Sequence, residues 1–405
     1  MTERFVMTGI GGVWNYGCEA IVRSTDAILR DVFPDCEVEL VSVVPKADAA
    51  ALADTRIRIR PARPRWSLHR IFRKVLRTAH LPWNWILDVN PTVWKQATCV
   101  LSIGGDIYTP HAGGLPWGTL LQEEHVLSLR TPLCLWGATV GPFEAGSPQE
   151  VRIKRYLDRL LLVSVRESKS VDYLRSIGVT RNVFLAADPA FTLRPDPFDC
   201  GPYWPRAKAD AVVALNLSPL LDFYLEAVSP DRTVRKIGKA CVERLLEALP
   251  ISLVLMPHVI ARNEADDDYR LLAAIAASLD RRFRDRVSVL PPGLGATRTK
   301  YLLGRCRAAV CARMHCAIAA VSSLVPTVCI SYSMKSLGVL GDLYGGSEWV
   351  VRLADLTPEV LLDRVRAILE KGAEVRRSLE ADIPAVQAKA ASAGQELKRR
   401  LCSRT

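Results

Sequence analysis

Arg313 and His315 stand two positions apart inside a long apolar segment, in the stretch CARMHCAIAA (311–320). A charged side chain in such a run is costly unless it is paired or used. Arginine can bind a carboxylate or phosphate through two parallel hydrogen bonds, and histidine can transfer a proton near neutral pH. The residue pattern predicts a strand over 308–312 and a helix from about His315. The pair therefore falls at a strand–helix junction, where a helix N-terminus favours anions, and we predict an anion-binding, proton-delivering site.

This segment has three other interpretations: a membrane span, a zinc site and a histidine buried in the core. A membrane span is disfavoured because the uncharged part, Cys316–Ile330, is short and contains Pro326. A zinc site is disfavoured because Cys306, Cys311 and their neighbours have no standard ligand spacing, so we predict no metal. A core histidine with satisfied hydrogen bonds remains the alternative for His315.

Two further motifs place polar residues directly after apolar strands. In LSIGGDIYTP (101–110), Gly104 and Gly105 let a ligand or another backbone approach closely. Asp106 follows them and could bind a sugar hydroxyl or act as a base; its alternative role is to cap a turn. In SVRESKS (164–170), Arg166 is placed to hold a carboxylate or phosphate, and its alternative is a salt bridge to Glu167 or another neighbour.

The glycine-rich stretch TGIGGVWNYGCEAI (8–21) follows the first predicted strand. It does not match a dinucleotide fingerprint, because Trp14 occupies the third glycine position. It does not match a phosphate-binding loop either, because Cys18 and Glu19 replace Lys and Ser/Thr. The stretch still places Asn15 and free backbone N–H groups at a helix N-terminus, which suits a neutral or anionic ligand. A tight turn without a ligand is the alternative.

These motifs depend on two successive series of strands and helices. The strands of the first series are predicted at Phe5–Ile10, Val38–Val43, Cys99–Ile103, Leu133–Val140, Leu162–Arg166 and Val183–Ala186. Those of the second are predicted at Val212–Leu217, Leu253–Met256, Val287–Leu290, Ala309–Cys311 and Val328–Ser331. His258 and Lys335 each follow a strand of the second series. The alternation predicts an α/β fold with two Rossmann-like, doubly wound parallel sheets.

The predicted domains are residues 1–195 and 211–350, joined by a proline- and glycine-rich linker at 196–210 and followed by C-terminal helices at 351–405. The tail is expected to break near Gly372 and Pro384. Ligands of such sheets bind at the carboxyl ends of the strands. We therefore expect the site in a cleft between the two domains.

Composition narrows the class of protein. The 405 residues carry a net charge of +11 and eleven cysteines without a C-x-x-C pair, which suits reduced thiols in the cytoplasm. No secretory signal is recognised at the N-terminus. Residues 63–85 combine a basic amphipathic helix with tryptophans, which indicates either a surface helix or a peripheral contact with the inner face of the plasma membrane. No nucleic-acid motif accompanies the basic segment, so nucleic acid is not an expected partner.

Taken together, these stretches resemble the polysaccharide pyruvyltransferase family. The resemblance rests on NYGCEA (15–20), SIGGD (102–106), WGATVGP (136–142), SVRES (164–168), ADPAF (187–191) and the segment from ARMHCAIAA to SYSMKSLG, in the family's order over about residues 5–345. The chain departs from the family pattern at Cys18, where an acidic residue is common, and at Ser333, where an aspartate is common.

The resemblance implies a fold like that of GT-B glycosyltransferases and transfer of a pyruvyl group from phosphoenolpyruvate to two hydroxyls of a sugar. It implies phosphoenolpyruvate as co-substrate, no separate cofactor, and a glycan acceptor that is free or lipid-linked. It also implies that residues 1–195 form the acceptor side and residues 211–350 the donor side. In the family, residues matching Arg166, Arg313, His315 and Lys335 bind the donor or act in catalysis. Beside His315 in catalysis, Asp106, or alternatively Glu19, is expected to orient or deprotonate the sugar hydroxyls. The residues expected in acceptor binding or in the loops around it are Asn15, Glu19, Gly104, Gly105 and His258.

Two other functions remain open from the sequence. A GT-B glycosyltransferase would use a nucleotide sugar, although no glutamate suited to the nucleotide follows a strand late in the second domain. A non-catalytic glycan- or membrane-binding protein of the same fold would not bind phosphoenolpyruvate.

Overall fold

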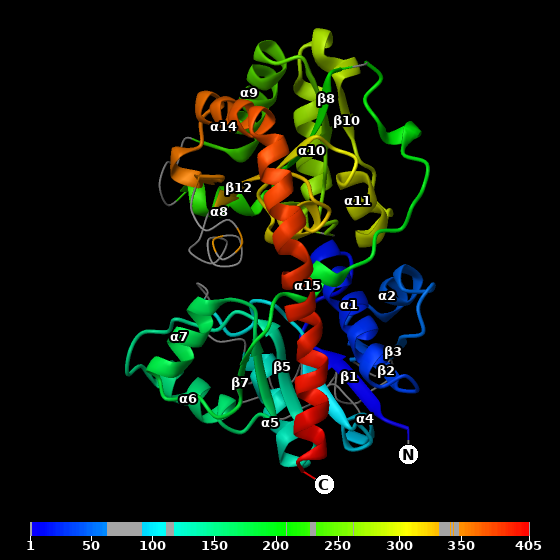
Figure 1. The fold of residues 1–405 in the computed structure, drawn as a ribbon, viewed down its shortest axis with the longest axis vertical. Coiled ribbons are helices and arrows are strands. Elements are labelled where there is room, and N and C mark those ends of the chain that lie inside the picture. Colours follow the sequence, from blue (N-terminus) through cyan, green and yellow to red (C-terminus); the bar gives the residue numbers. More distant parts are fainter. Residues whose placement is uncertain are drawn as a thin grey trace, which may run out of the picture. The chain divides into compact units, whose positions relative to one another are not determined.

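The computed structural model describes residues 2–62, 91–110, 117–207, 209–226, 232–261, 263–331, 341, 343 and 348–404. The predicted basic helix of residues 63–85, Ser333 and Lys335 lie outside these residues. The chain divides into two compact units (Figure 1). Unit 1 is Met1–Val13, Val22–Asp188 and Lys389–Thr405, and unit 2 is Trp14–Ile21 and Pro189–Ala388. The chain therefore passes between the units more often than the predicted linear order of domains, because helices α1 and α15 each belong partly to both.

Unit 1 contains a parallel sheet of seven strands in the order β3-β2-β1-β4-β5-β6-β7. Its strands are β1 (Arg4–Thr8), β2 (Glu37–Ser42), β3 (Arg58–Pro61), β4 (Cys99–Ser102), β5 (Leu133–Ala138), β6 (Leu162–Val165) and β7 (Val183–Leu185). Its helices are α1 (Tyr16–Val32, which begins in unit 2), α2 (Pro45–Ala51), α4 (Pro91–Lys95), α5 (Trp117–Ser128), α6 (Pro148–Leu157) and α7 (Ser168–Ser176).

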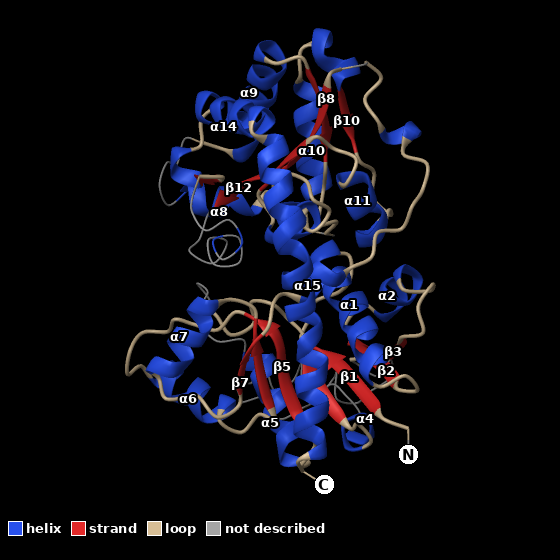
Figure 2. Ribbon diagram, in the orientation of Figure 1, coloured by secondary structure: helices blue, strands red, loops and turns tan. Residues whose placement is uncertain are grey.

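Unit 2 contains a parallel sheet of six strands in the order β10-β9-β8-β11-β12-β13. Its strands are β8 (Ala211–Asn216), β9 (Ile251–Leu255), β10 (Val287–Val289), β11 (Ala308–Cys311), β12 (Thr327–Ser331) and β13 (Val350–Arg352). Its helices are α8 (Leu220–Glu226), α9 (Val234–Ala248), α10 (Asp268–Ser278), α11 (Gly295–Leu303), α12 (Met314–Val321), α14 (Pro358–Glu370) and α15 (Gly372–Cys402, which ends in unit 1). Helices surround the strands of each sheet in Figure 2.

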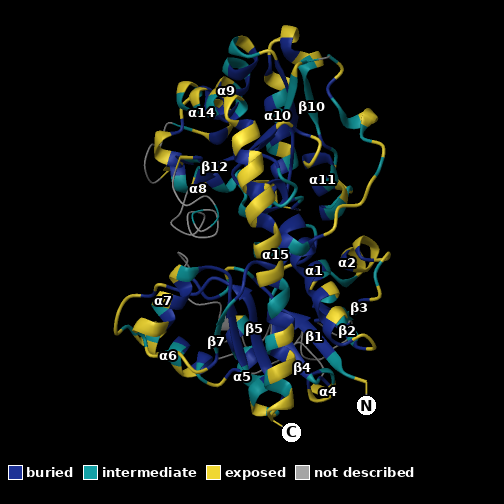
Figure 3. Ribbon diagram, in the orientation of Figure 1, coloured by how far each residue is buried: buried dark blue, intermediate teal, exposed yellow. Residues whose placement is uncertain are grey.

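Burial on both faces explains the composition of the strands. Central strands such as CVLS in β4 and ISLVL in β9 are buried along their whole length, whereas helices expose their outer faces (Figure 3). Parallel strands covered on both sides are expected to be almost continuously apolar. This pattern confirms the predicted fold class of two Rossmann-like parallel α/β sheets, each doubly wound outward from its centre.

The sequence pattern missed two strands, and both are edge strands. β3 has the sequence RIRP, in which Arg60 is held by an ion pair with Glu39 of β2 at 2.7 Å. β13 has only three residues, Val350–Arg352. Edge strands are often short and charged, so they lack the apolar run that marks a buried strand.

One of the two helix breaks predicted in the C-terminal tail is confirmed. Thr357 caps α14 by accepting a hydrogen bond from the Val360 N–H, with Pro358 at the first helical position, and α15 begins at Gly372. The predicted break at Pro384 is wrong, because α15 continues through it. The buried residues Leu379 and Ile383 precede the proline, and packing of this kind can hold a helix across a residue that disfavours it. Among the described residues, no helix combines the length and the apolar character that crossing a membrane requires.

Candidate active site

The Arg313–His315 junction lies where the sheet of unit 2 changes direction. β8 and β11 are neighbours at the centre of the sheet, and the chain leaves them toward opposite edges. Ligands of doubly wound sheets bind at this switch point, beside the carboxyl ends of the strands. Asn216, the last residue of β8, fixes the junction by accepting a hydrogen bond from the Arg313 backbone N–H at 2.9 Å. The predicted placement of Arg313 and His315 between a strand and a helix is therefore confirmed.

Arg313 is held by two aspartates that precede or begin α10. Its Nη2 lies 2.7 Å from Asp266 Oδ1 and 2.9 Å from Asp268 Oδ1, and its Nε donates to Asp268 at 3.2 Å. The Arg313 side chain is 12% exposed, and its Nη1 makes no hydrogen bond to any described residue. Burial raises the pKa of Asp268, and Arg313 opposes that rise. One edge of the guanidinium is thus fixed, and the other is available to an anion.

His315 packs against the first turn of α1, far away in the sequence. A Cβ added to Gly17 would lie 2.6 Å from His315 Cγ and Nδ1, so only glycine leaves room for the ring in this position. Asn15 caps α1 by accepting a hydrogen bond from the Gly17 N–H at 2.9 Å. Asn15 also pairs with Val259 in an isolated antiparallel bridge. The NYG and RMH motifs therefore form one site within unit 2.

Two more residues of this segment support the same site. Tyr16 donates its backbone N–H to the His258 carbonyl at 2.9 Å, and the two rings meet edge to face at 6.0 Å. Glu19 is 2% exposed and accepts a hydrogen bond from the Ala296 N–H at 2.8 Å, which stabilises the start of α11. His258 is itself buried. The structure therefore places Glu19 and His258 behind the site, where they position its elements.

Unit 1 holds a second group of charged residues around Arg166, which follows β6. The guanidinium is fully buried and lies 2.5 Å from Asp106 and 2.8 Å from Asp188, with Glu167 at 3.7 Å. Its Nε donates to Thr139 Oγ1 at 3.0 Å. The sequence alternative of a contact with Glu167 is therefore present, but Asp106 and Asp188 are the closer partners. Burial raises the pKa of Glu167, and Arg166 opposes that rise.

The glycine pair of SIGGD serves packing within unit 1. A Cβ on Gly105 would lie 2.5 Å from Arg166 Nη1, and one on Gly104 would collide with the side chain of Ile107. The Asp106 side chain remains 51% exposed. Gly105 therefore lets Arg166 approach the loop and hold the Asp106 carboxylate at the surface, while Gly104 makes room for Ile107.

A buried carboxylate supports this loop from below. The hydroxyls of Tyr108 and Tyr156 both donate to Glu123 of α5, and the two rings lie 5.3 Å apart. Burial raises the pKa of Glu123, and the hydrogen bonds from its neighbours oppose the rise. Tyr108 is also bridged to Val140 after β5. The segment that carries Asp106 is thus fixed on its C-terminal side, at Tyr108.

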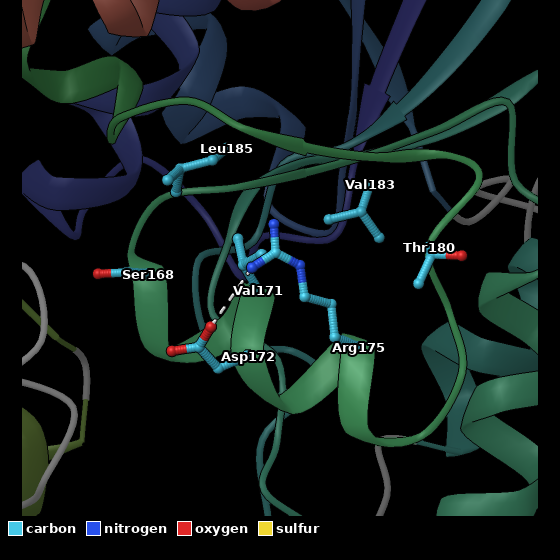
Figure 4. A pocket seen from close by; sticks show the side chains of 7 residues that line it. All are labelled: Ser168, Val171, Asp172, Arg175, Thr180, Val183 and Leu185. Carbon is cyan, nitrogen blue, oxygen red and sulfur yellow. Dashed lines mark ion pairs between the residues drawn. The ribbon is translucent and has the colours of Figure 1, made fainter.

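A pocket of about 220 Å³ lies elsewhere in unit 1, at edge strand β7 (Figure 4). Its wall includes Asp172 and Arg175, which form an ion pair at 3.7 Å and are 74% and 68% exposed. Such exposed, mutually paired side chains are typical of a solvated surface. We therefore assign no function to this pocket.

The sequence could not show several residues of these sites. Asp188, Asp266 and Asp268 were not predicted, although each is the partner of a predicted arginine. One feature of the sequence could have pointed to these aspartates: a charged residue next to an apolar segment, as in AADPAF (186–191). Among the described residues, no group of three or more His, Cys, Asp or Glu side chains is arranged to hold a metal ion.

The fold is shared with UDP-N-acetylglucosamine 2-epimerases and with a glycotransferase. A putative UDP-N-acetylglucosamine 2-epimerase from Listeria monocytogenes superposes with a TM-score of 0.59 at 11% identity, covering 97% of this chain and 94% of the other. The UDP-GlcNAc 2-epimerase from Neisseria meningitidis gives 0.59 at 10% identity, covering 99% and 100%. The glycotransferase of kitacinnamycin gives 0.56 at 14% identity, covering 98% and 99%. At these identities the likeness establishes the GT-B-like fold alone.

The sequence comparisons are more specific. The amylovoran biosynthesis protein AmsJ from Erwinia amylovora is 24% identical over 299 residues, which cover 70% of this chain and 68% of AmsJ. The family model described as polysaccharide pyruvyl transferase matches residues 15–334. That range begins at Asn15 and includes Asp106, Arg166, Arg313 and His315. The chain belongs to the polysaccharide pyruvyl transferase family.

Proposed function

We propose that this protein transfers the pyruvyl group of phosphoenolpyruvate to two hydroxyls of one sugar in a glycan, forming a ketal and releasing phosphate. The family supports pyruvyl transfer in polysaccharide biosynthesis. The observation that carries the finer proposal is the junction of unit 2, where a half-open guanidinium and an imidazole lie two residues apart at the sheet's switch point.

The donor's charge fits Arg313. Phosphoenolpyruvate carries a carboxylate and a phosphate, and the free Nη1 edge of Arg313 can donate to either. Asp266 and Asp268 keep the guanidinium in one orientation, so little conformational entropy is lost when the donor binds. Lys335, which the family resemblance also assigns to the donor, completes the proposed set from outside the described residues.

His315 is the proposed general acid. It protonates the methylene carbon of the donor, which makes the neighbouring carbon electrophilic. One sugar hydroxyl attacks that carbon, and attack by the second expels phosphate. The contact with Gly17 fixes the plane of the imidazole, which a directed proton transfer requires.

Asp106 is the proposed residue that orients or deprotonates an acceptor hydroxyl. Arg166 lies behind it with Nε, Nη1 and Nη2 each donating to a side-chain oxygen of unit 1. We therefore propose that Arg166 acts through Asp106, although the sequence assigned it to the donor. Residues 63–85 are proposed to hold a lipid-linked acceptor at the cytoplasmic membrane surface.

The test is to incubate the protein with phosphoenolpyruvate and a panel of synthetic or lipid-linked glycans, and to follow phosphate release together with the mass of the glycan. We expect both to rise together. Phosphoenolpyruvate should also stabilise the protein thermally, whereas UDP should not. Stabilisation by UDP with no response to phosphoenolpyruvate would instead favour a nucleotide-sugar enzyme.

His315→Gln locates the chemistry. Loss of a general acid costs about 10²–10⁴-fold in turnover, while thermal stabilisation by phosphoenolpyruvate should persist because Arg313 is intact. His125→Gln, on α5 of unit 1, is the matched loss of an imidazole and should leave turnover unchanged. Normal turnover in His315→Gln would exclude the assigned role.

A further inference from the structure

Two cysteines enclose the Arg313–His315 junction. Cys311 is the last residue of β11, and Cys316 lies in the first turn of α12. Their Sγ atoms are 3.5 Å apart, and the residues are 2% and 0% exposed. A disulfide joins two sulfurs at about 2.05 Å, so a small movement of the junction would bring these atoms to bonding distance.

The surroundings make the two sulfurs unequal. The Cys311 thiol donates a hydrogen bond to Cys316 Sγ, and the imidazole of His258 lies beside the same sulfur. These neighbours outweigh burial and lower the pKa of Cys316 to about 6, whereas burial raises the pKa of Cys311 well above its ordinary value. The thiolate is the reactive form of cysteine, so Cys316 has the character of an attacking sulfur and Cys311 that of a resolving thiol.

We propose that Cys311 and Cys316 are a peroxide-sensitive thiol pair that closes a disulfide around the Arg313–His315 junction. The Cys316 thiolate attacks one oxygen of hydrogen peroxide, the O–O bond breaks, and hydroxide leaves, which gives a sulfenic acid. The sulfur of Cys311 then attacks the sulfenic sulfur. The S–O bond breaks, and the thiol proton leaves with the departing hydroxide as water. Two thiols are oxidised and one peroxide is reduced to two waters.

Burial of Cys311 and Cys316 limits which oxidants can reach their sulfurs. The segment 313–315 between the two cysteines is only half-buried, whereas Cys311 and Cys316 are both buried. A small neutral peroxide can reach them through local opening. Glutathione disulfide is too large to approach without unfolding the junction, so we expect no mixed disulfide with glutathione.

The disulfide would act on the site through tight packing. Closing it draws the end of β11 and the first turn of α12 together, between the hydrogen bond of Arg313 to Asn216 and the contact of His315 with Gly17. We expect the imidazole to lose its position and transfer activity to fall. This consequence rests on the proposed function, but the thiol chemistry does not.

Unit 1 supplies a matched pair. Cys99 and Cys134 lie 3.4 Å apart and are both fully buried. Burial raises the pKa of Cys99 well above its ordinary value, and the neighbouring thiol adds to the rise. Distance alone would make the two pairs equally reactive. Thiolate character predicts that the Cys311–Cys316 pair reacts at least about tenfold faster.

The experiment treats the full-length protein with hydrogen peroxide, blocks the remaining thiols by alkylation, and maps disulfides by peptide mass spectrometry. We expect a Cys311–Cys316 disulfide first, with loss of two hydrogen atoms, and its reversal by dithiothreitol. An unmodified Cys316, a disulfide of Cys316 to Cys306, or equally fast oxidation of Cys99 and Cys134 would overturn the proposal.

Cysteine variants distinguish the attacking sulfur of Cys316 from the resolving thiol of Cys311. Cys311→Ser keeps a hydroxyl that can donate to Cys316 Sγ but cannot form a disulfide, so it should leave a sulfenic acid on Cys316 that a cyclic 1,3-dione traps. Cys329→Ala, which removes the buried cysteine opposite Cys311 on β12, should leave the disulfide unchanged. Peroxide should lower phosphate release by wild type reversibly. A mapped disulfide with undiminished turnover would contradict only the proposed coupling to His315. A protein without pyruvyl transfer would contradict the proposed function, and the mapped disulfide would still support the thiol site.

Discussion

Two arginines, Arg166 buried and Arg313 half-buried, illustrate how the same residue serves different ends in the two units. Arg166 and Arg313 each follow the carboxyl end of a parallel strand, and each meets carboxylates that lie elsewhere in the sequence. Arg166 is fully buried, and its Nε, Nη1 and Nη2 all have side-chain acceptors. Arg313 keeps its Nη1 edge open among the described residues. Exposure of one guanidinium edge, more than the residue type, distinguishes an arginine that can bind a ligand from one that holds the fold.

Lys300, a buried lysine, completes the comparison. Lys300 of α11 is 2% exposed, and its Nζ has no hydrogen-bond partner among the described residues. Burial lowers its pKa to about 7. The three residues thus form a series, with three carboxylates beside Arg166, two beside Arg313 and none of the described ones beside Lys300.

The largest expected effect is the loss of Arg166. Arg166→Met removes the cation that lies between Asp106, Asp188 and Glu167, and breaking a buried pair in this way costs about 3–5 kcal/mol of unfolding free energy. Urea unfolding followed by circular dichroism measures it.

Two matched substitutions set the scale for that result. Arg313→Met should cost less, about 1–3 kcal/mol, because Asp268 also accepts backbone N–H groups of His258 and Val259 at 3.1 Å each. Arg175→Met, at an exposed position of α7, should change the unfolding free energy by no more than about 0.5 kcal/mol. An Arg166→Met protein as stable as wild type would remove the distinction between Arg166 and Arg313.

Lys300→Met is expected to have the opposite sign. The folded pKa of about 7 lies below that of an unfolded lysine, so the cost of burying the charge is full below pH 7 and disappears as the pH rises toward about 10.4. At pH 7 the variant should be more stable by roughly 2–4 kcal/mol. The difference between variant and wild type should shrink steadily from pH 7 to 10 in parallel urea titrations.

Lys239→Met provides the control for the pH series. Lys239 lies on α9 in the same unit, with its side chain 42% exposed and paired with Glu243 at 3.5 Å. Its difference from wild type should stay flat over the same pH range. A flat series for Lys300→Met as well would show that Lys300 has a counter-charge.

The comparison also shows which parts of the site a sequence can reveal. Arg166 and Arg313 were predicted because each directly follows a strand that is buried on both faces and therefore reads as an apolar run. Two of their partners, Asp188 and Asp268, were not predicted, because they lie 22 and 45 residues from Arg166 and Arg313 in the sequence. Pairing across such distances depends on strand order, which periodicity does not encode.

The role of the N-terminal motif was obscure for a similar reason. The sequence places NYGCEA after the first strand, and hence in the predicted first domain. In the structure, residues 14–16 pair with residues 258–260, which assigns the motif to unit 2. A glycine that makes room for an imidazole looks the same in sequence as a glycine that shapes a turn. Only the fold distinguishes the two.

Arg313→Lys tests the open edge of the guanidinium. Lysine keeps the charge but lacks the planar fork that contacts two aspartates and a donor together. We expect the KM for phosphoenolpyruvate to rise about 10–100-fold, with a smaller change in kcat, in phosphate-release assays. Arg270→Lys, at an exposed position of neighbouring α10, should leave both constants unchanged. An unchanged KM in Arg313→Lys would mean that the donor does not contact this residue.

The smallest expected effect concerns how His315 is held. Gly17→Ala adds a methyl group whose carbon would lie 2.6 Å from the imidazole, so the ring must move. Overpacking costs about 1–3 kcal/mol, and the higher helix propensity of alanine offsets up to about 1 kcal/mol of it. We expect kcat to fall about tenfold with little change in the KM for phosphoenolpyruvate, because Arg313 is anchored by Asn216 and the two aspartates rather than by Gly17. Gly118→Ala is the control, since Gly118 also lies in the first turn of a helix but an added Cβ there meets nothing within 4 Å. The Gly118→Ala variant should be slightly more stable than wild type and fully active. A loss of kcat in Gly17→Ala alone would then be due to the displaced imidazole. Equal activity of the two variants would show that the Gly17 contact does not position His315.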